Sequence, residues 1–367
     1  MRIGTITVHN GYNYGASLQA HALVHFLRSR GFDAYLLDYR AEKIERQQAK
    51  SEESSPVVKF INRLLFNSAG YALRRERFDS FNCDIMNAKA DTYYTLQELK
   101  KANELFDCFI CGSDQIWNPA ITDGDEAFFL GFAERNKKCI AYAPSLGTET
   151  IADEAFFKHH LQRFCALSVR EAHNAADIER LSGKSCTTVV DPVLLLSREH
   201  WIDTAGKAAP VKPKKPYVFY YTLHPDEELF SYAKAEAKRR KAVLLRVDIL
   251  PAKAILKGCR SISNKGVGPA EFVQLIMGAE YIITNSFHGT AFSVLLEKDF
   301  CVKLLSGKLA GKNLRITQLL SQVGLADRIL REQEKKDSIT EWSSVRAEIE
   351  AQRNYAASYL CNAINQE

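Results

Sequence analysis

The chain has 367 residues, of which 46% are hydrophobic and 25% charged, with only 19 Gly and 10 Pro. This length predicts about two domains, and the composition excludes disordered, collagen-like and low-complexity proteins. Lys and Arg number 49 against 44 Asp and Glu, a net charge of +5. Because this small excess is spread along the chain, no nucleic-acid partner is expected, whereas an anionic small substrate is compatible with it.

The sequence carries no signal for secretion or membrane insertion. Its first eight residues lack the long apolar core of a secretory signal, and no run of about 18 uncharged apolar residues occurs. Nine cysteines, several of them in apolar runs, predict reduced buried thiols rather than disulfides. We therefore expect a cytoplasmic protein without a transmembrane segment.

The first half of the chain alternates strands and helices. A strand at 3–8, a helix over 18–27 and a strand at 34–37 form a β-α-β unit. The segment 40–101 is first polar, then helical and basic, and we interpret it as an insertion. Short apolar runs that end in turn-forming or polar residues predict further buried parallel strands at 106–111, 139–143, 167–169 and 187–190.

The second half repeats the alternation after a stretch of 206–216 with three prolines among lysines, which is typical of a semi-rigid linker. Strands are predicted at 217–222, 243–247, 281–284 and 300–304. Helices are predicted at about 226–241 and 270–278, at about 313–323 and finally at 341–363. A further helix is predicted to begin directly after the polar turn 285–290.

This pattern predicts an α/β protein with two Rossmann-like, doubly wound domains. The last helix is expected to cross back to the first domain. The expected division is an N-terminal domain at 1–205, a linker at 206–216, a C-terminal domain at 217–337, and a C-terminal helix at 338–367.

Ligands of doubly wound sheets bind beyond the carboxyl ends of the strands, so the loops that follow strands are the candidate sites. The loop 9–17 is rich in Gly and Asn and opens a helix, which favours an anion or a polar ligand, although a generic turn explains it equally well. It contains Asn13 and Tyr14, and it matches neither the Walker A nor the GxGxxG pattern.

A second loop, 111–119, follows an apolar strand. Trp117 offers a flat face for a sugar ring, and Ser113 lies beside Asp114. The Asp114 carboxylate either orients or deprotonates a hydroxyl, or caps a helix. The CxxC formed by Cys108 and Cys111 has no second ligand pair, so core packing is favoured over zinc.

Two further loops carry basic residues. Arg170 ends a strand, and its guanidinium suits a carboxylate or phosphate, or else an ion pair with Glu171 or another acid. In the turn 284–290, His288 stands at a helix N-terminus beside the amides of Gly289 and Thr290, where an anion would bind.

Elsewhere in the sequence, His21 and His25 share a helix face, but no HExxH pattern accompanies them. No metal is therefore expected.

The ordered motifs resemble those of the polysaccharide pyruvyl transferase family over residues 4 to about 325. The segments that carry the resemblance are Asn13–Ala20, Gly112–Trp117, Ser168–Glu171, Val190–Pro192 and Asn285–Ser293.

The resemblance implies a two-domain fold similar to glycosyltransferase-B. It also implies transfer of a pyruvyl group from phosphoenolpyruvate onto a sugar of a cell-surface glycan, an exopolysaccharide or its precursor, as a ketal. In this interpretation His288 is the acid and Arg170 binds the donor, and no cofactor is needed. The N-terminal domain is then on the acceptor side, and the residues expected to bind the acceptor sugar are Asn13, Tyr14, Ser113, Asp114 and Trp117. Peripheral contact with a lipid-linked glycan is compatible with it.

The chain departs from the family at one place. Well-known members resemble Arg-Leu-His-Gly at the catalytic turn, whereas this chain has Ser286-Phe287-His288-Gly289, so one expected phosphate-binding Arg is absent. Residues predicted to bind the donor anion in its place, besides Ser286, Gly289 and Thr290, are Arg246, Lys265 and Arg315. The alternatives to pyruvyl transfer are a glycosyltransferase that uses a nucleotide sugar, and a catalytically silent glycan-binding relative.

Overall fold

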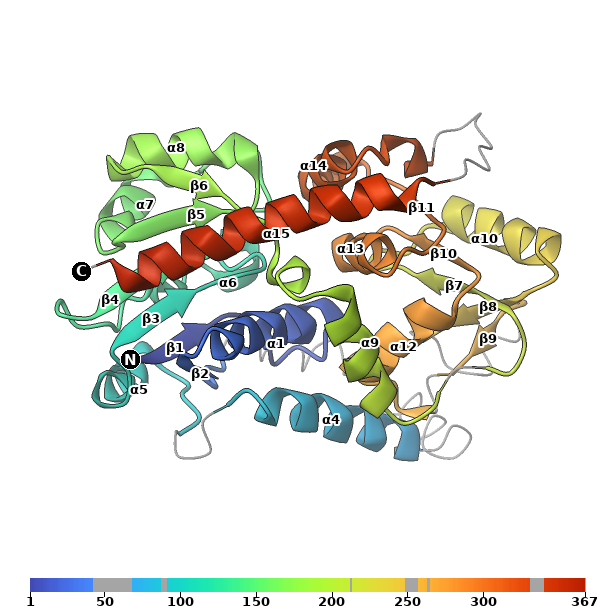
Figure 1. Cartoon of the computed structure of the whole chain (residues 1–367), viewed down its shortest axis with the longest axis horizontal. Helices are drawn as coiled ribbons and strands as arrows, with labels where there is room; N and C mark the ends of the chain where they lie inside the picture. The colour runs from blue at the N-terminus through green and yellow to red at the C-terminus, as the bar shows by residue number, and fades with distance from the viewer. Residues whose placement is uncertain are drawn as a thin grey trace. The chain divides into compact units, whose positions relative to one another are not determined.

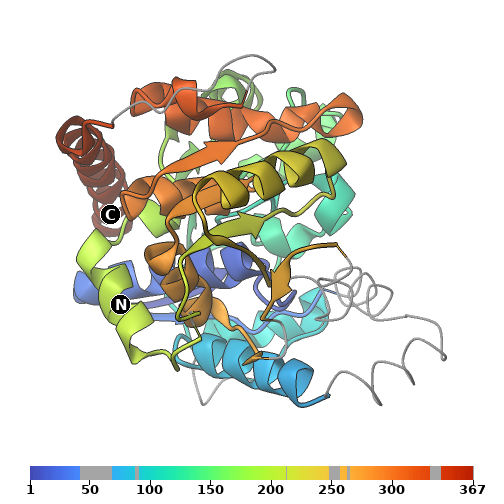
Figure 2. The ribbon, with the colours of Figure 1, turned by 90° about the vertical axis from the view of Figure 1, so that its right-hand side faces the viewer.

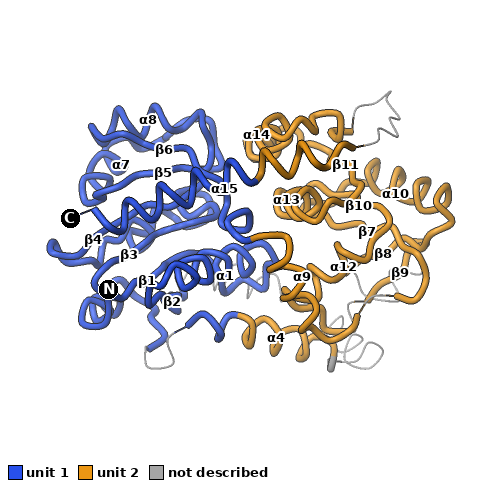
Figure 3. The backbone as a smooth tube through the Cα atoms, viewed as in Figure 1, with its two compact units in different colours: residues 1–53, 82–196, 350–367 blue, residues 54–81, 197–349 orange. Residues whose placement is uncertain are grey.

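The computed structural model describes residues 1–41, 68–86, 91–211, 213–247, 257–262, 265–330 and 340–366. The polar stretch 47–55 of the predicted insertion and Lys212 of the predicted linker lie outside these ranges. Within them the chain forms two compact units (Figure 3), each built on a parallel sheet. Unit 1 comprises 1–53, 82–196 and 350–367, and unit 2 comprises 54–81 and 197–349.

The sheet of unit 1 has the strand order β2-β1-β3-β4-β5-β6, and every neighbouring pair is parallel (Figure 1). Its strands are short, and the four inner ones are almost wholly buried, as expected for strands covered by helices on both faces. They are β1 (Arg2–Ile6), β2 (Asp33–Leu36), β3 (Cys108–Cys111), β4 (Lys138–Ala141), β5 (Ala166–Val169) and β6 (Cys186–Thr188). The helices are α1 (Tyr14–Ser29), α5 (Leu96–Leu99), η1 (Lys100–Glu104), α6 (Pro119–Thr122), η2 (Glu126–Phe129), α7 (Glu154–Leu161), α8 (Ala172–Ser182) and η3 (Pro192–Leu194).

The sheet of unit 2 has the order β11-β10-β7-β8-β9, again parallel throughout. Figure 2 looks onto this unit, and α10 lies along β7 and β8. The strands are β7 (Tyr217–Tyr221), β8 (Val243–Arg246), β9 (Arg260–Ser261), β10 (Tyr281–Thr284) and β11 (Phe300–Val302). The helices are α9 (Arg198–Lys207), α10 (Glu227–Arg239), α12 (Pro269–Gly278), α13 (Phe287–Leu295), η5 (Gly307–Asn313), α14 (Leu314–Gln322) and η6 (Ala326–Arg328).

Two helices contribute residues to both units. α4 (Ser68–Cys83) belongs mainly to unit 2, whereas α15 (Trp342–Asn365) begins in unit 2 and continues into unit 1. In unit 1 the Arg353 guanidinium donates to the Leu194 carbonyl at 2.8 Å, and Ala356 and Leu360 are fully buried. The predicted doubly wound fold and the return of the last helix are therefore confirmed. The exact domain limits proposed from the sequence stay a proposal.

Candidate functional site

In each unit the first strand lies inside the sheet, with its successor on one side and a later strand on the other. This arrangement makes a topological switch point, where ligands of such sheets bind beyond the strand ends. The switch points fall between β1 and β3 in unit 1, and between β7 and β10 in unit 2. The loops that follow these four strands therefore form the candidate sites.

The switch point of unit 2 is held together by Asn285. Because Tyr221 of β7 is in register with Thr284 of β10, the loops that follow them start side by side. The buried Asn285 amide joins these loops: its Oδ1 accepts from the Leu223 amide at 3.0 Å, and its Nδ2 donates to the His224 carbonyl at 2.8 Å. The loop after β7 is thus fixed relative to the His288 turn.

The His288 turn is ordered by its own polar residues. Ser286 caps α13, with its Oγ accepting from the Gly289 amide at 3.4 Å and its carbonyl accepting from the Thr290 amide at 3.0 Å. The Ser286 amide in turn donates to Thr284 Oγ1 at 3.0 Å. The two amides expected to bind an anion are therefore bonded within the turn, so a bound anion would depend on side chains here.

His288 is 7% exposed and lies in the first turn of α13, with its ring centroid 5.2 Å from that of Phe287. The Arg315 Cζ atom lies 5.4 Å from the Phe287 centroid, so α14 brings a guanidinium to this turn. The other two candidates lie elsewhere. Arg246 stacks over Tyr220, at 5.1 Å, and Lys265 is exposed in the loop before α12, where its carbonyl accepts from Arg77.

Two basic residues of unit 2 were missed by the sequence reasoning. His224 is half-buried in the loop directly after β7, and Lys312 is half-buried in η5. Burial and the nearby Lys312 charge lower the pKa of His224 below its ordinary value. His224 could have been predicted from its position, because it lies immediately after the strand predicted at 217–222, where ligands of such sheets bind.

The switch point of unit 1 is held by Gln19 of α1. Its Nε2 donates to Thr7 Oγ1 at 2.9 Å, and its Oε1 accepts from the Ser113 amide at 3.1 Å, so one side chain joins the loops after β1 and β3. Asn13 caps α1 by accepting from the Gly15 and Ala16 amides, and Tyr14 is 5% exposed. The helix N-terminus is thus already capped by Asn13.

Arg170 lies at the centre of a buried charge cluster in unit 1. Its guanidinium contacts Asp191, Glu171 at 3.7 Å and Asp114 at 3.4 Å. Burial acts to lower the pKa of Arg170, but the three carboxylates outweigh it and raise this pKa. With 4% of its side chain exposed, Arg170 serves as the counter-ion of these acids. The ion-pair interpretation thus accounts for the position of Arg170, and its binding of the donor stays a prediction.

The loop after β3 divides into buried and accessible residues. Trp117 is 1% exposed, its ring stacks on Phe129 at 5.2 Å, and its Nε1 donates to the Phe128 carbonyl. The prediction that it offers a face to a sugar finds no support in this packing. Ser113 is fully buried as well, with its Oγ bonded to the Ala143 carbonyl, whereas the Asp114 side chain is 18% exposed.

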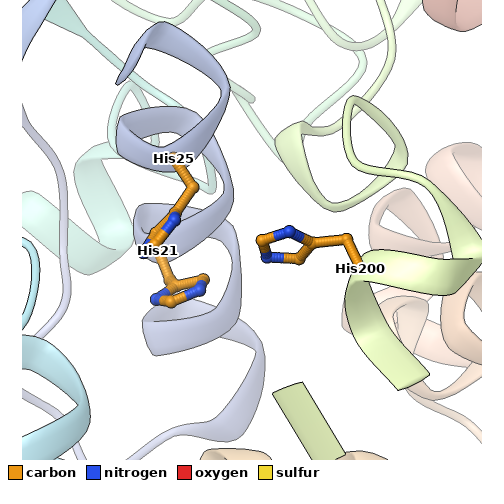
Figure 4. A group of neighbouring side chains, drawn as sticks. All are labelled: His21, His25 and His200. Atoms are coloured by element: carbon orange, nitrogen blue, oxygen red, sulfur yellow. The ribbon is translucent and has the colours of Figure 1, made fainter. Parts of the chain in front are cut away.

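His21 and His25 lie one turn apart on α1, and their rings stack with centroids 3.9 Å apart (Figure 4). A further buried polar pair of unit 1 is His9 with Asp38, joined at 3.1 Å. Cys108 and Cys111 are buried in β3, which agrees with core packing.

The comparisons with solved structures define the class of protein. The chain is similar to a putative UDP-N-acetylglucosamine 2-epimerase from Listeria monocytogenes, with 12% identity and a TM-score of 0.53 over 99% of this chain and 95% of that one. A UDP-GlcNAc 2-epimerase from Methanocaldococcus jannaschii gives 12% identity and a TM-score of 0.51, over 96% of this chain and 93% of that one. At such identities the likeness shows the fold alone, which is of the glycosyltransferase-B type.

The family follows from the sequence match. The family model described as polysaccharide pyruvyl transferase matches residues 13–302, and the chain belongs to this family. A search of curated protein sequences finds no match. Among the helices of the described ranges, none is both long and apolar enough to cross a membrane.

Proposed function

We propose that this chain transfers a pyruvyl group from phosphoenolpyruvate onto two hydroxyls of one sugar in a cell-surface polysaccharide or its precursor. Family membership supports a transferase that acts on a polysaccharide. The observation that carries the proposal further is His288, a nearly buried imidazole at the switch point of unit 2 with the Arg315 guanidinium close to its turn. Such a site combines an acid with a fixed positive charge.

The chemistry needs both groups. His288 donates a proton to the methylene carbon of the donor, and the adjacent carbon gains oxocarbenium character and is attacked by a sugar hydroxyl. Phosphate then leaves with the proton of the second hydroxyl, which closes the ketal, while the proton of the first hydroxyl restores the acid. The sugar gains pyruvate less one water, and one inorganic phosphate is released. A positioned acid typically contributes a factor of about 10² to 10⁴ in rate.

Arg315 is proposed to hold the negative charge of the donor. A guanidinium that is 8% exposed acts in a less polar medium than water, where its attraction for an anion is stronger. On the acceptor side, Asp114 keeps a partly exposed carboxylate, which we propose orients a sugar hydroxyl. Since phosphoenolpyruvate is a cytoplasmic metabolite, we place the reaction in the cytoplasm, on a lipid-linked or nucleotide-linked precursor.

Thermal denaturation of the purified chain with phosphoenolpyruvate or with UDP tests the donor. We expect phosphoenolpyruvate to raise the melting temperature, since a ligand at about 100 times its Kd adds roughly 2.7 kcal/mol of stability. Stabilisation by UDP alone would instead support a glycosyltransferase that uses a nucleotide sugar. A ligand of this class, UDP-GlcNAc, is bound in the structure of the UDP-GlcNAc 2-epimerase from Neisseria meningitidis. Arg315→Gln should lose most of the shift, whereas Arg135→Gln in unit 1 should keep it.

A further inference from the structure

A second basic group stands at the switch point of unit 2 beside the His288 turn. His224 follows β7 at the same sheet edge at which His288 follows β10, and the two bonds of Asn285 fix the backbone at 223–224 to that turn. His224 is half-buried in the loop after β7. The backbone at His224 is therefore held by the loop after β10 as well as by its own loop.

Lys312 joins this group from a third loop. It lies in η5, which Asn313 fastens to the end of β11 through two bonds with Leu305, at 2.8 and 2.7 Å. Three residues further on, Arg315 reaches the ring of Phe287. The Lys312 ammonium is close enough to His224 to act on its charge state. The loops after β7, β10 and β11, with the start of α14, thus bring two imidazoles and two cations to one edge.

Two acidic residues close to His224 in the sequence are paired with a third cation. Asp226 and Glu228, which follow His224, both bind the Lys303 ammonium, Asp226 at 3.1 Å. The Gly289 and Thr290 amides are bonded to Ser286. A negatively charged ligand at this edge would consequently be bound by side chains, and the half-buried Lys312 and His224 are accessible enough to reach one.

We propose that Lys312 and His224 together bind the phosphate group of the ligand, so that the phosphate lies between the loops that follow β7 and β11. This inference rests on the proposed function for the identity of the donor, but the phosphate subsite itself does not depend on it. An ammonium provides a compact point charge for phosphate, and a histidine supplies a directed N–H donor.

The subsite also predicts an uptake of protons. Burial and Lys312 hold the pKa of His224 below its ordinary value of about 6.5, so the ring is neutral at pH 7 when no anion is bound. A phosphate dianion beside the ring favours its charged form and raises this pKa. Of the charged groups near this loop, Lys312 acts on the ring directly, while Asp226 is paired with Lys303. Binding should therefore take up a fraction of a proton at pH 6 to 7.

Isothermal titration of the full chain with phosphoenolpyruvate, and separately with inorganic phosphate, tests the inference. We expect Lys312→Gln to weaken both ligands by about 10- to 100-fold, the range for a charged hydrogen bond, and Lys312→Arg to recover most of the affinity. Lys238→Gln, which removes an exposed lysine of α10, is the matched control and should bind like the wild type. Titrations in two buffers of different ionisation enthalpy should show proton uptake that His224→Gln abolishes.

The outcomes separate the subsite from the proposed function. If Lys312→Gln binds phosphoenolpyruvate and phosphate as tightly as the wild type, the subsite is wrong and the donor assignment stands. If the wild type binds phosphate in a Lys312-dependent manner but does not bind phosphoenolpyruvate, the subsite stands and the donor assignment is wrong. Binding of neither ligand would overturn both.

Discussion

Asp38 anchors a buried polar network at the end of β2 in unit 1. Its carboxylate accepts hydrogen bonds from the His9 ring at 3.1 Å, from Thr92 Oγ1 at 2.7 Å and from the Arg40 guanidinium at 3.2 Å. Burial acts to raise the pKa of Asp38, but these bonds outweigh it and hold the pKa well below its ordinary value. The ionised carboxylate therefore stabilises the loop that begins at His9.

The pH dependence of stability follows from this pKa. A carboxyl group with a lowered folded-state pKa contributes stability above its unfolded value, about 4, and loses it as the pH falls through the folded value. We expect Asp38→Asn to lower the free energy of unfolding by about 2 kcal/mol at pH 7, with a smaller difference from the wild type below pH 3. Urea denaturation at several pH values measures this. Asp33→Asn, in an exposed pair with Arg2, is the control and should change little; a constant difference for Asp38→Asn at all pH values would contradict the account.

Single-residue roles were the hardest feature to predict from the sequence. Arg170 was interpreted as a donor-binding group or an ion-pair partner, and its partners Asp191 and Asp114 lie 21 and 56 residues away. Trp117 was expected to meet a sugar, but Phe129 and Phe157 cover its ring. Local patterns show that a residue is charged or aromatic, whereas its burial depends on contacts that only the fold brings together.

At the scale of elements, the turn into α13 explains why Gly289 follows His288. A Cβ atom added at Gly289 would lie 2.5 Å from Thr284 Oγ1 and 3.3 Å from the Tyr221 ring. Thr284 is fully buried and its Oγ1 accepts from the Ser286 amide, so it has little room to move. The close approach of α13 to the ends of β7 and β10 thus requires a glycine.

Gly289→Ala should therefore disturb the site as well as the fold. We expect a loss of about 1 to 3 kcal/mol in the free energy of unfolding, the range for overpacking a core, together with loss of the stabilisation by phosphoenolpyruvate. The matched control is Gly206→Ala in α9, where an added Cβ meets nothing within 4 Å, and the helix should gain up to about 1 kcal/mol. Calorimetry with and without the ligand measures both effects. Equal stability of Gly289→Ala and the wild type would show that the turn tolerates the methyl group.

The sequence predicted most secondary-structure elements because their signals are local. Short apolar runs ending in polar turns predicted β1 to β8, β10 and β11, with ends that differ by at most two residues, whereas the two-residue β9 has too little pattern to be recognised. α4 shows the limit of local reasoning. Its Arg77 donates to the carbonyls of Lys265 and Gly266, 188 and 189 residues further along the chain, and pairs with Glu271 at 3.3 Å. No local pattern in the 40–101 segment indicates these partners.

At the scale of the whole molecule, the family match and the two doubly wound units agree with each other. The family model spans both units, and each unit presents loops at its own switch point. Unit 2 carries the imidazole and the cations, and unit 1 carries a partly exposed carboxylate, Asp114. This division of groups is compatible with the proposed transfer from an anionic donor to a neutral sugar.

The most direct measurement is a transfer assay on the purified full chain with phosphoenolpyruvate and a set of oligosaccharides. Released phosphate and the mass of the sugar are followed together. We predict one phosphate released for each sugar that gains the mass of pyruvate less one water. The His173→Ala variant, which lacks an exposed histidine of α8, should transfer the pyruvyl group in the same way. A folded His288→Ala variant should not transfer it. Undiminished transfer by His288→Ala, or a mass gain of a hexose from a nucleotide sugar instead, would contradict the account.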